Sequence, residues 1–402
     1  MSRIVRSFLA LTLLLSPLLP STAQAAPGDP IGPVFALADE SLSGRPAVAR
    51  NALGSFVVAW TRPAGVSARL FAADGSPLTP VLDVGNTQSP RTQVDVAIDT
   101  QGNFVVVWDS LATHTARLGQ VRAQRYDMVG QRRGLPLLVS AGLLARQPHV
   151  AMDAAGNFAV TFVSDVSAEV PIPYNPRSGV GLGFLRLYSA GGLARGLPQA
   201  VDAAYANLSF DSAVEQVDVA MNASGEFVCA WMHARGLLPG NTDISIRRYS
   251  RLGLPLGLTR FAAPGEQEFA NVAIDAAGNF VVSWKDTAGN GDDHRIRWRR
   301  YTAATRTLDA EQVLGDSPMP SNAYYHDVAM APDGRFVFAW NIAPYPEFLV
   351  QPFASDGTPL RAPHPAMPDA SQSQPVVAMD ALGNFVLVWR DGKPYAQLFS
   401  GS

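Results

Sequence analysis

Apolar runs separated by short polar turns recur along the chain in one phrase. The phrase reads "VAIDAAGNFVVSW" at residues 272–284 and "VAMDALGNFVLVW" at residues 377–389. Two β-prone runs flank a turn that contains Gly, a residue that adopts left-handed backbone at little cost. The phrase therefore predicts a β-hairpin. Because nearly every residue of the runs is apolar, we expect both faces of the hairpin to be covered.

Seven copies of the phrase align on their first Val, and these residues are Val48, Val96, Val150, Val219, Val272, Val328 and Val377. Each copy has Gly six residues after this Val and Phe two residues after the Gly. Twelve residues after the Val stands an aromatic residue, namely Trp60, Trp108, Phe162, Trp231, Trp284, Trp340 or Trp389. A second phrase that ends in Phe or Tyr follows each hairpin and leads, in most copies, into a further β-prone run. Each repeat thus predicts up to four strands.

The turn glycines recur at intervals of 48 to 69 residues. A four-stranded unit at that period indicates a β-propeller blade or a solenoid coil. The last copy ends after its third strand, while "PVFALAD" at residues 33–39 resembles the missing fourth strand. A solenoid would need capping repeats instead. We therefore predict an all-β, seven-bladed β-propeller of four-stranded blades, with a ring closed by the N-terminal strand, which completes the last blade and leaves no open sheet edge there.

The N-terminus has the pattern of a secretory signal peptide. Arg3 and Arg6 precede the apolar run "FLALTLLLSPLLP", and "AQA" follows at residues 23–25. We expect residues 1–25 to be removed and residues 26–402 to form a single propeller domain, exported to the periplasm or outside the cell. The run is too short and too broken by Pro for a membrane span, and no second stretch of about 18 apolar residues follows. We expect a monomer without a membrane span.

Composition narrows the function further. The net charge is -3, charged residues make up 16% of the chain, and no basic patch of the kind that neutralises phosphates is present, so nucleic acid is not an expected partner. The single cysteine, Cys229, cannot form an internal disulfide. At its register the other copies have Val58, Val106, Val160, Val282, Phe338 and Leu387. We therefore predict that Cys229 is a buried core residue and not a nucleophile.

The composite phrase "VAxDAxGNFVVxW…AQRYDxxGxPLG" resembles repeats of large exported bacterial proteins, and the resemblance covers the mature chain. It implies a repeat-built propeller of unknown task and supplies no catalytic residues. The sialidase Asp-box, the "DxDGxxD" calcium loop and the "WD" dipeptide are absent from the sequence. The recurring Trp could form stacking platforms for sugars. Because it occurs at one register in six of seven copies, we predict instead that it packs between neighbouring blades.

The residue before each first Val is polar in five of the seven copies: Asp95, His149, Asp218, Asn271 and Asp327. If the first strand of each blade is innermost, these side chains lie near one mouth of the central channel. There they could bind a ligand or hold a cation, and their oxygen ligands suit Ca²⁺. Alternatively, each Asp caps its own turn or bonds to the backbone of the next blade.

Loops of variable length on one face are the second candidate site, because binding residues concentrate on loops that a rigid scaffold presents. Two segments and two further residues on that face hold candidate chemistry. "KDTAGNGDDHR" contains Asp286, Asn290, Asp292 and Asp293, an oxygen-rich candidate for Ca²⁺ that lacks the spacing of a dedicated loop. "NAYYHD" contains Tyr324, Tyr325 and His326 beside Asp327, and His233 and Tyr345 could join them as contacts for a sugar or peptide. A solvated turn and ordinary packing are the alternatives.

Catalytic motifs are absent: the six His show no metal-ligand spacing, and there is no GxSxG and no phosphate-binding loop. The main prediction is therefore a non-enzymatic binding propeller, for a glycan or for an envelope or surface protein, with no cofactor except Ca²⁺. A first alternative is a hydrolase or lyase of extracellular polysaccharide that uses Asp95, Asp218 and Asp327 as acids or bases. A second alternative is a structural component of an exported assembly.

Overall fold

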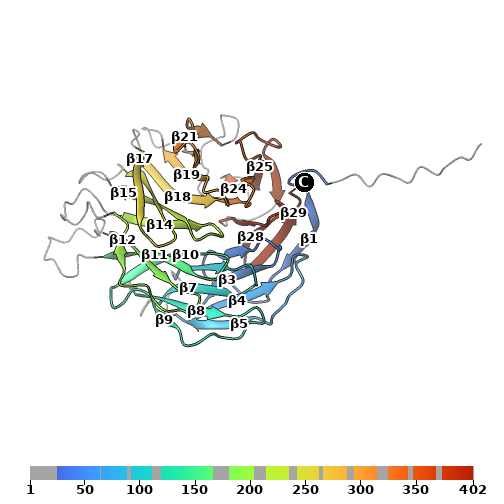
Figure 1. Cartoon of the computed structure of the whole chain (residues 1–402). Helices are drawn as coiled ribbons and strands as arrows, with labels where there is room; N and C mark the ends of the chain where they lie inside the picture. The colour runs from blue at the N-terminus through green and yellow to red at the C-terminus, as the bar shows by residue number, and fades with distance from the viewer. Residues whose placement is uncertain are drawn as a thin grey trace, which may run out of the picture.

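The computed structural model describes residues 25–63, 65–87, 92–110, 119–165, 181–202, 214–234, 242–261, 266–287, 294–314, 325–342, 347–367 and 374–401. In these ranges all regular secondary structure is β-strand, as predicted. The sheets follow one another in chain order (Figure 1). The fold is all-β and resembles a β-propeller.

Each copy of the repeated phrase forms the predicted hairpin. The first strands of the hairpins are β2 (Ala47–Arg50), β6 (Val94–Ile98), β10 (Ala145–Met152), β14 (Val214–Met221), β18 (Glu266–Ile274), β23 (His326–Met330) and β27 (Val376–Met379). The second strands are β3 (Phe56–Arg62), β7 (Phe104–Ser110), β11 (Phe158–Asp165), β15 (Phe227–Ala234), β19 (Phe280–Thr287), β24 (Phe336–Ile342) and β28 (Phe385–Asp391). The two strands of every hairpin pair in antiparallel fashion.

Further antiparallel strands extend each hairpin outward. The third strands are β4 (Gly65–Phe71), β8 (Gln120–Tyr126), β12 (Gly181–Tyr188), β16 (Thr242–Tyr249), β20 (His294–Thr302), β25 (Glu347–Phe353) and β29 (Lys393–Phe399). The outer strands are β1 (Pro30–Ala36), β5 (Leu82–Asn86), β9 (Leu137–Leu138), β13 (Gln199–Ala200), β17 (Pro255–Phe261), β21 (Thr307–Leu308), β22 (Gln312–Val313) and β26 (His364–Met367).

The strands form five sheets of four strands and one sheet of nine strands, counted over the described residues. The larger sheet contains the fourth and fifth copies of the repeat, which one parallel pairing joins, between Thr242 and Glu266. The N-terminal strand β1 pairs antiparallel with β29 of the last copy, and this part of the prediction is confirmed. The strand covers Pro30–Ala36, so it starts earlier and ends earlier than the predicted segment.

In six of the seven copies the hairpin turn is held by an acidic or amide side chain three residues after the first Val, and the sixth copy has Ala331 at this position. In the second copy, Asp99 Oδ1 accepts hydrogen bonds from the backbone N–H groups of Gln101 and Asn103, at 2.9 and 2.8 Å. Asn103 Nδ2 donates to Asp99 Oδ2 at 2.8 Å. Gly102 has a φ of 89°, the left-handed conformation that the turn requires. Asp153, Asp275 and Asp380 make the same set of bonds in their own turns.

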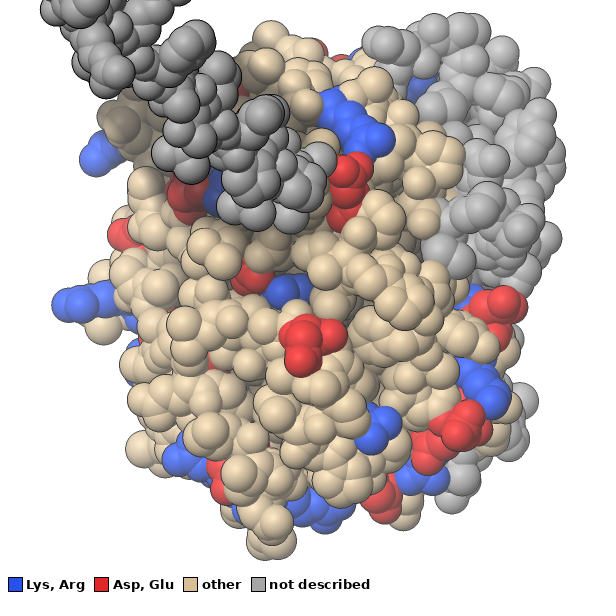
Figure 2. All heavy atoms as spheres, turned by 90° about the vertical axis from the view of Figure 1, so that its right-hand side faces the viewer, with Lys and Arg blue, Asp and Glu red and all other residues tan. Residues whose placement is uncertain are grey.

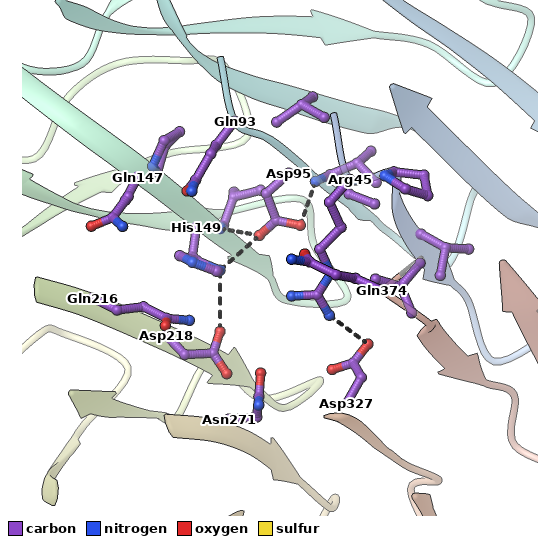
Figure 3. Close-up of a pocket in the computed structure, with 18 of the residues that line it drawn as sticks. Arg45, Gln93, Asp95, Gln147, His149, Gln216, Asp218, Asn271, Asp327 and Gln374 are labelled. Carbon is purple, nitrogen blue, oxygen red and sulfur yellow. Dashed lines mark hydrogen bonds and ion pairs between the residues drawn. The ribbon is translucent and has the colours of Figure 1, made fainter. Parts of the chain in front are cut away.

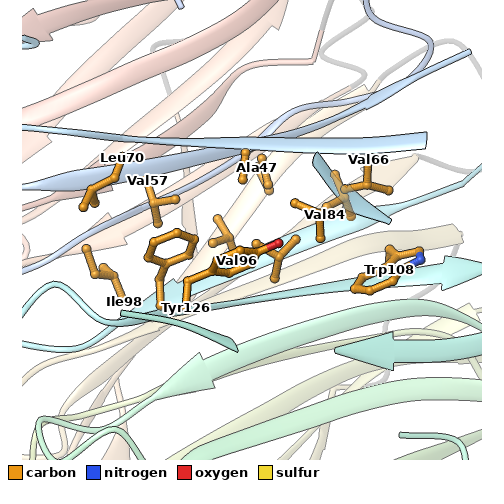
Figure 4. Packing of buried hydrophobic residues seen from close by; sticks show 14 residues of the cluster. Ala47, Val57, Val66, Leu70, Val84, Val96, Ile98, Trp108 and Tyr126 are labelled. Atoms are coloured by element: carbon orange, nitrogen blue, oxygen red, sulfur yellow. The ribbon is translucent and has the colours of Figure 1, made fainter. Parts of the chain in front are cut away.

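The core lies between consecutive sheets. Figure 4 shows Trp108 and Val96 of the second copy against Val66 and Val84 of the first. Gly85 leaves room for the indole, since a Cβ there would lie 2.6 Å from Trp108 Cζ2. Each aromatic residue at this register is no more than 2% exposed, in Trp60, Trp108, Phe162, Trp231, Trp284, Trp340 and Trp389. The prediction that these residues pack between units is confirmed, and none of them lies open to a sugar.

A stacked aromatic pair also recurs between the second and third strands. Phe104 and Tyr126 are cross-strand partners, with ring centroids 4.9 Å apart and ring planes 13° apart. The equivalent pairs have centroids 4.6 to 4.9 Å apart and are Phe56–Phe71, Phe158–Tyr188, Phe227–Tyr249, Phe280–Tyr301, Phe336–Phe353 and Phe385–Phe399. Stacked aromatic pairs contribute beyond their buried area. The aromatic residue that ends the second phrase is therefore part of the scaffold.

The first and last copies contact each other. Figure 1 shows β1, in blue, beside β29, in red. One hydrophobic cluster contains Phe56 and Trp60 of the first hairpin together with Val386 and Val388 of the last. At the hairpin turns, Arg50 Nη2 donates a hydrogen bond to Asp380 Oδ2 at 2.9 Å. Contacts of this kind bring the two ends of the repeat array together.

The surface around β1 and β29 carries charges of both signs. On the face shown in Figure 2, the described Lys and Arg side chains are interspersed with Asp and Glu, and they form no continuous basic area there. Within the described residues, no helix has the length and apolar composition needed to cross a bilayer.

Candidate functional site

The candidate site is a pocket at the start of the seven first strands, which we call the central pocket (Figure 3). Its volume is about 430 Å³, within the range of small-molecule sites. Residues at three positions of the repeat account for most of its lining, and all three are counted from the first Val of each hairpin. Because the repeat places one such residue in each copy, several strands contribute side chains to one cavity.

Three sets of residues line the central pocket. The entry set lies three positions before the Val and comprises Arg45, Gln93, Gln147, Gln216, Phe269, Tyr325 and Gln374. The carboxylate set lies one position before the Val and comprises Ala47, Asp95, His149, Asp218, Asn271, Asp327 and Val376. The valine set comprises Val48, Val96, Val150, Val219, Val272 and Val377. Within each hairpin, no described residue that follows the first Val lines the pocket. The structure therefore brings the predicted Asp95, His149, Asp218, Asn271, Asp327 and Tyr325 into one cavity.

Each Asp of the carboxylate set bonds to two backbones. Asp95 Oδ1 accepts from the backbone N–H of Val96, and Asp95 Oδ2 accepts from that of Val150 in the next copy, both at 2.8 Å. Asp218 makes the same bonds to Val219 and Val272, and Asp327 to Val328 and Val377, at 2.8 to 3.0 Å. The bonds to the next copy are those of the alternative prediction, in which each Asp bonds to the backbone of the next blade. The three carboxylates therefore stabilise the scaffold, while they also face the cavity.

His149 lies between two of these carboxylates (Figure 3). Its Nδ1 is 3.7 Å from Asp95 Oδ2 and 3.4 Å from Asp218 Oδ1. Because both oxygens lie close to one nitrogen, they are no more than about 7 Å apart, an upper limit that admits the carboxyl separation of about 5 to 5.5 Å in retaining glycoside hydrolases. Burial lowers the pKa of His149 despite the opposing effect of Asp95. We therefore expect a neutral imidazole at pH 7.

Burial raises the pKa of Asp95, Asp218 and Asp327 from 3.8 to about 6. The side chains are still 22%, 16% and 21% exposed, and this surface faces the cavity. His149 opposes the rise most at Asp95, the backbone bond from Val272 at Asp218, and Arg45 at Asp327. Near pH 6 the central pocket thus holds both protonated and ionised carboxyl groups, the states that acid–base catalysis needs.

Arg45 is the one Lys or Arg among the residues that line the central pocket. Its Nη2 lies 3.9 Å from Asp327 Oδ2 and donates a hydrogen bond to the backbone oxygen of Pro375 at 3.2 Å. A cation beside a carboxyl group favours the ionised form. Of the three carboxylates, Asp327 is the one that forms an ion pair with Arg45, although Arg45 also opposes the rise in the pKa of Asp218.

The sequence analysis did not predict the entry set as site residues, apart from Tyr325. Its members differ in chemistry, so they form no conserved column, although Gln recurs in four of seven copies and could have revealed them. The buried Asp109 holds two of them in place. Its Oδ1 accepts from the backbone N–H of Gln93 at 2.8 Å, and its Oδ2 accepts from that of Gln147 at 3.1 Å. Asn341 Oδ1 holds the backbone of Tyr325 in the same way, at 2.9 Å.

Two predicted histidines lie outside the central pocket. His326 is 2% exposed, and its Nε2 lies 3.1 Å from Ser283 Oγ and 3.1 Å from Asn271 Nδ2. Burial lowers its pKa to about 3, so it stays neutral. His233 is 5% exposed, with Nδ1 3.2 Å from Ser245 Oγ. Both side chains are buried in the scaffold: His326 contacts Asn271 and Ser283 of the preceding copy, and His233 lies beside Ser245 of its own sheet.

Of the four residues predicted as an oxygen-rich calcium site, the structure describes Asp286 alone. Asp286 is 5% exposed and accepts a hydrogen bond from Arg297 Nε at 2.6 Å, so a cation partner already occupies it. The other residues of this prediction and two predicted tyrosines lie outside the described residues: Asn290, Asp292, Asp293, Tyr324 and Tyr345. Among the described residues, no group of three or more His, Cys, Asp or Glu is arranged to hold a metal ion. Calcium binding stays a prediction.

Known proteins share the fold. No protein-family model matches the sequence, and no curated protein matches it. Among solved structures, Hadza microbial sialidase Hz136 is 12% identical with a TM-score of 0.53, over 86% of this chain and 76% of that one. Penicillium chrysogenum alpha-L-arabinanase complexed with arabinobiose is 12% identical with a TM-score of 0.50, over 77% and 94%. Kuenenia stuttgartiensis hydrazine synthase is 10% identical with a TM-score of 0.54, over 90% and 97%.

At these identities the likeness establishes the fold alone, because one fold hosts many functions. The comparison nevertheless corrects two predictions. The solved structures of this fold include a sialidase and an arabinanase, which are glycoside hydrolases. They contradict the main prediction of a non-enzymatic binding propeller and the expectation that the protein is not an enzyme. The alternative of polysaccharide hydrolysis agrees better with them.

Proposed function

We propose that the protein is an exported glycoside hydrolase whose active site is the central pocket. The observation that carries this proposal is the pair of carboxyl groups, Asp95 and Asp218, on either side of His149 in an open cavity. Most glycoside hydrolases cleave the glycosidic bond with a pair of carboxyl groups that flank it. The sialidase and the arabinanase of the same fold support this reaction class.

The chemistry follows from two carboxyl groups that titrate together. Both have a pKa raised to about 6, and ionisation of one disfavours ionisation of the other. The protonated member donates its proton to the glycosidic oxygen, and the C–O bond to the leaving sugar breaks. The ionised member either removes a proton from the attacking water or attacks the anomeric carbon before water does. Neutral His149 places one ring nitrogen, Nδ1, close to both carboxyl groups, and this atom can accept a hydrogen bond from the protonated member or donate one to the ionised member.

In the proposed architecture, the seven hairpins are the inner strands of seven blades that close into a ring, and β1 completes the last blade. The mixed hydrophobic cluster of the first and last copies supports closure, as does the bond from Arg50 to Asp380. A ring places the starts of all first strands around one axis and accounts for a pocket lined by every copy. The exported bacterial repeat proteins that the phrase resembles would share this architecture.

The test is sugar release by the mature chain, residues 26–402, from nitrophenyl glycosides and a panel of polysaccharides. We expect Asp95→Asn and Asp218→Asn to lower kcat by about 10²- to 10⁴-fold. Asp99→Asn is the matched control, since Asp99 lies in the same hairpin as Asp95 but at its turn, where Asn51 and Asn222 stand in other copies. Circular dichroism would verify that all three variants fold.

Two results would count against a hydrolase. One is a wild-type protein that releases no sugar from any member of the panel. The other is full activity in both pocket variants. Equal losses of activity in Asp95→Asn and Asp99→Asn would instead indicate a general folding defect. The pH dependence of the wild-type activity would then test whether a carboxyl group with a raised pKa takes part in catalysis. A catalytic acid with a pKa near 6 requires activity that declines as the pH rises above that value.

A further inference from the structure

Two aromatic residues of the entry set form a wall of the central pocket. Phe269 on β18 and Tyr325, directly before β23, have ring centroids 5.6 Å apart and meet edge to face at 60°. Lys285 Nζ lies 5.8 Å from the Phe269 centroid and helps to fix this ring. Aromatic faces pack against the apolar faces of sugar rings. Sequence copies without an aromatic residue at this register supply Gln or Arg instead.

Amide side chains supply the polar part of the same set. Among the described residues, the side chains of Gln93, Gln216 and Gln374 make no hydrogen bond, although all three line the cavity. An amide offers two donors and one oxygen acceptor without carrying a charge. Sugar hydroxyls also donate and accept, so they match amides well. These three glutamines have no hydrogen-bond partner within the described part of the chain, and they are consequently available to a ligand.

Backbone strain marks this set as more than scaffold. Gln147 and Phe269 both have a φ of 54°, in the left-handed region that residues with a side chain rarely adopt. Each lies at an irregularity of strand pairing, between Arg146 and His149 in one case and between Glu268 and Asn271 in the other. β-Bulges beside functional sites re-aim side chains. At both positions the bulge directs an entry-set residue into the cavity, in two different copies of the repeat.

The charges of the central pocket restrict its ligand. Three carboxyl groups line it, against one arginine, and that arginine already contacts Asp327 and the Pro375 carbonyl. An acidic sugar would bring a further negative charge beside these groups without a free cation to meet it. Like charges in a partly buried site repel each other strongly. An uncharged sugar meets only the amides, the aromatic wall and whichever carboxyl groups its hydroxyls reach.

We infer that the central pocket recognises an uncharged glycan, with Phe269 and Tyr325 as its stacking wall and the entry-set glutamines as its hydroxyl contacts. This inference rests on the proposed function for the reaction, but glycan binding can be measured without it. The substrate of this chain would then differ in charge from that of a sialidase. Gln93, Gln216 and Phe269 would be determinants of specificity, and the carboxylate set would carry out the chemistry.

The experiment compares binding by two groups of short glycans to the mature chain. Cellotetraose, xylotetraose and mannotetraose are neutral, whereas trigalacturonate and sialyllactose are acidic. Calorimetry and thermal melts measure binding, and sugar release is measured in parallel. We expect at least one neutral glycan to bind and neither acidic glycan to do so. Phe269→Leu and Gln216→Ala should each raise the Kd at least 10-fold. Gln131→Ala, at an exposed position between β8 and β9, is the control and should leave the Kd unchanged.

The outcomes separate this inference from the proposed function. Binding of a neutral glycan without any hydrolysis would sustain the inference and overturn the hydrolase. Hydrolysis of only the acidic glycans would sustain the hydrolase and overturn the inference. Tight binding of only the acidic glycans without hydrolysis would overturn both. Absence of binding by every glycan of the panel would overturn the inference. An unchanged Kd in both Phe269→Leu and Gln216→Ala would also overturn it, because binding would then lie elsewhere.

Discussion

Asp95 joins two neighbouring copies of the repeat, because its Oδ2 accepts a hydrogen bond from the backbone N–H of Val150 at 2.8 Å. Its Oδ1 also accepts a hydrogen bond from the backbone N–H of Val96 in its own strand. Two further copies repeat this bond, through Asp218 and Asp327. A side chain that faces the central pocket therefore also holds adjacent sheets together. A mutation in the carboxylate set can thus alter both the chemistry of the pocket and the stability of the fold.

The first prediction concerns the structural part of this role. Replacing Asp327 with Ala removes both acceptors and leaves the N–H groups of Val328 and Val377 without their partner. Unsatisfied buried donors cost about 1 to 3 kcal/mol each, so we expect the free energy of unfolding to fall by at least that amount. Urea denaturation at pH 7 measures it. Gln131→Ala is the control and should change stability by less than about 0.5 kcal/mol. A loss no larger than the control's would mean that these bonds contribute nothing.

The second prediction concerns pH. The pKa of Asp218 is raised to about 6 by burial, so the folded chain holds this proton more tightly than the unfolded chain. Its stabilising contribution is fully present below the unfolded pKa and is lost as the pH rises through 6. We expect the free energy of unfolding of the wild type, minus that of Asp218→Asn, to decrease by about 1.4 kcal/mol per pH unit between pH 4 and 6. Denaturation curves at several pH values measure this slope.

Asp356 provides the control for the pH experiment. Hydrogen bonds from Thr358 lower the pKa of this exposed carboxyl group. The difference between the wild type and Asp356→Asn should therefore increase as the pH rises through the usual range of Asp, opposite in sign to that for Asp218. The comparison with each variant removes the contribution of groups that both proteins carry, such as His326. A flat difference for Asp218 would show that its pKa is normal in the folded chain.

Much of the fold could be predicted because the repeat supplies seven aligned copies. Agreement between copies identified the hairpins, the buried aromatic column and the pairing partner of β1. A residue such as Trp108 can be assigned to the core because its equivalents are all apolar. Periodicity of this kind reports burial directly, since a column that stays apolar in every copy must face the same environment.

The site was predicted only in part, for the opposite reason. The carboxylate set was found because Asp recurs at one position. The entry set was missed because Arg45, Gln93 and Phe269 share a register but no chemistry. His326 was chosen for its neighbours in sequence, yet strand alternation turns it away from the cavity, while Asp327 and Tyr325 on either side line it. Function was mispredicted because the absence of a linear motif says nothing about carboxyl groups that meet across strands.

The third prediction concerns the lone cysteine. Cys229 is fully buried between the third and fourth copies, and burial raises the pKa of its thiol. A protonated, inaccessible thiol does not react, so we expect no modification by an aromatic disulfide reagent in native buffer and full modification in concentrated urea. Val stands at this register in Val58 and three other copies, so Cys229→Val should change stability by less than about 1.5 kcal/mol. Rapid labelling of the native chain would contradict the buried assignment.

The fourth prediction concerns the contact between the two ends of the repeat array. Arg50 and Asp380 are 3% and 4% exposed and lie 2.9 Å apart, although 330 residues separate them in sequence. Removing one partner of a buried ion pair leaves the other charge without compensation, so we expect Arg50→Met to cost about 3 to 5 kcal/mol in urea denaturation. Arg62→Met breaks an ion pair with Asp83, which is 65% exposed, and should cost less than about 1 kcal/mol. If the two variants lost equal stability, the first and last hairpins would not be held together by this pair, and the proposed closed ring would lose one of its two supports.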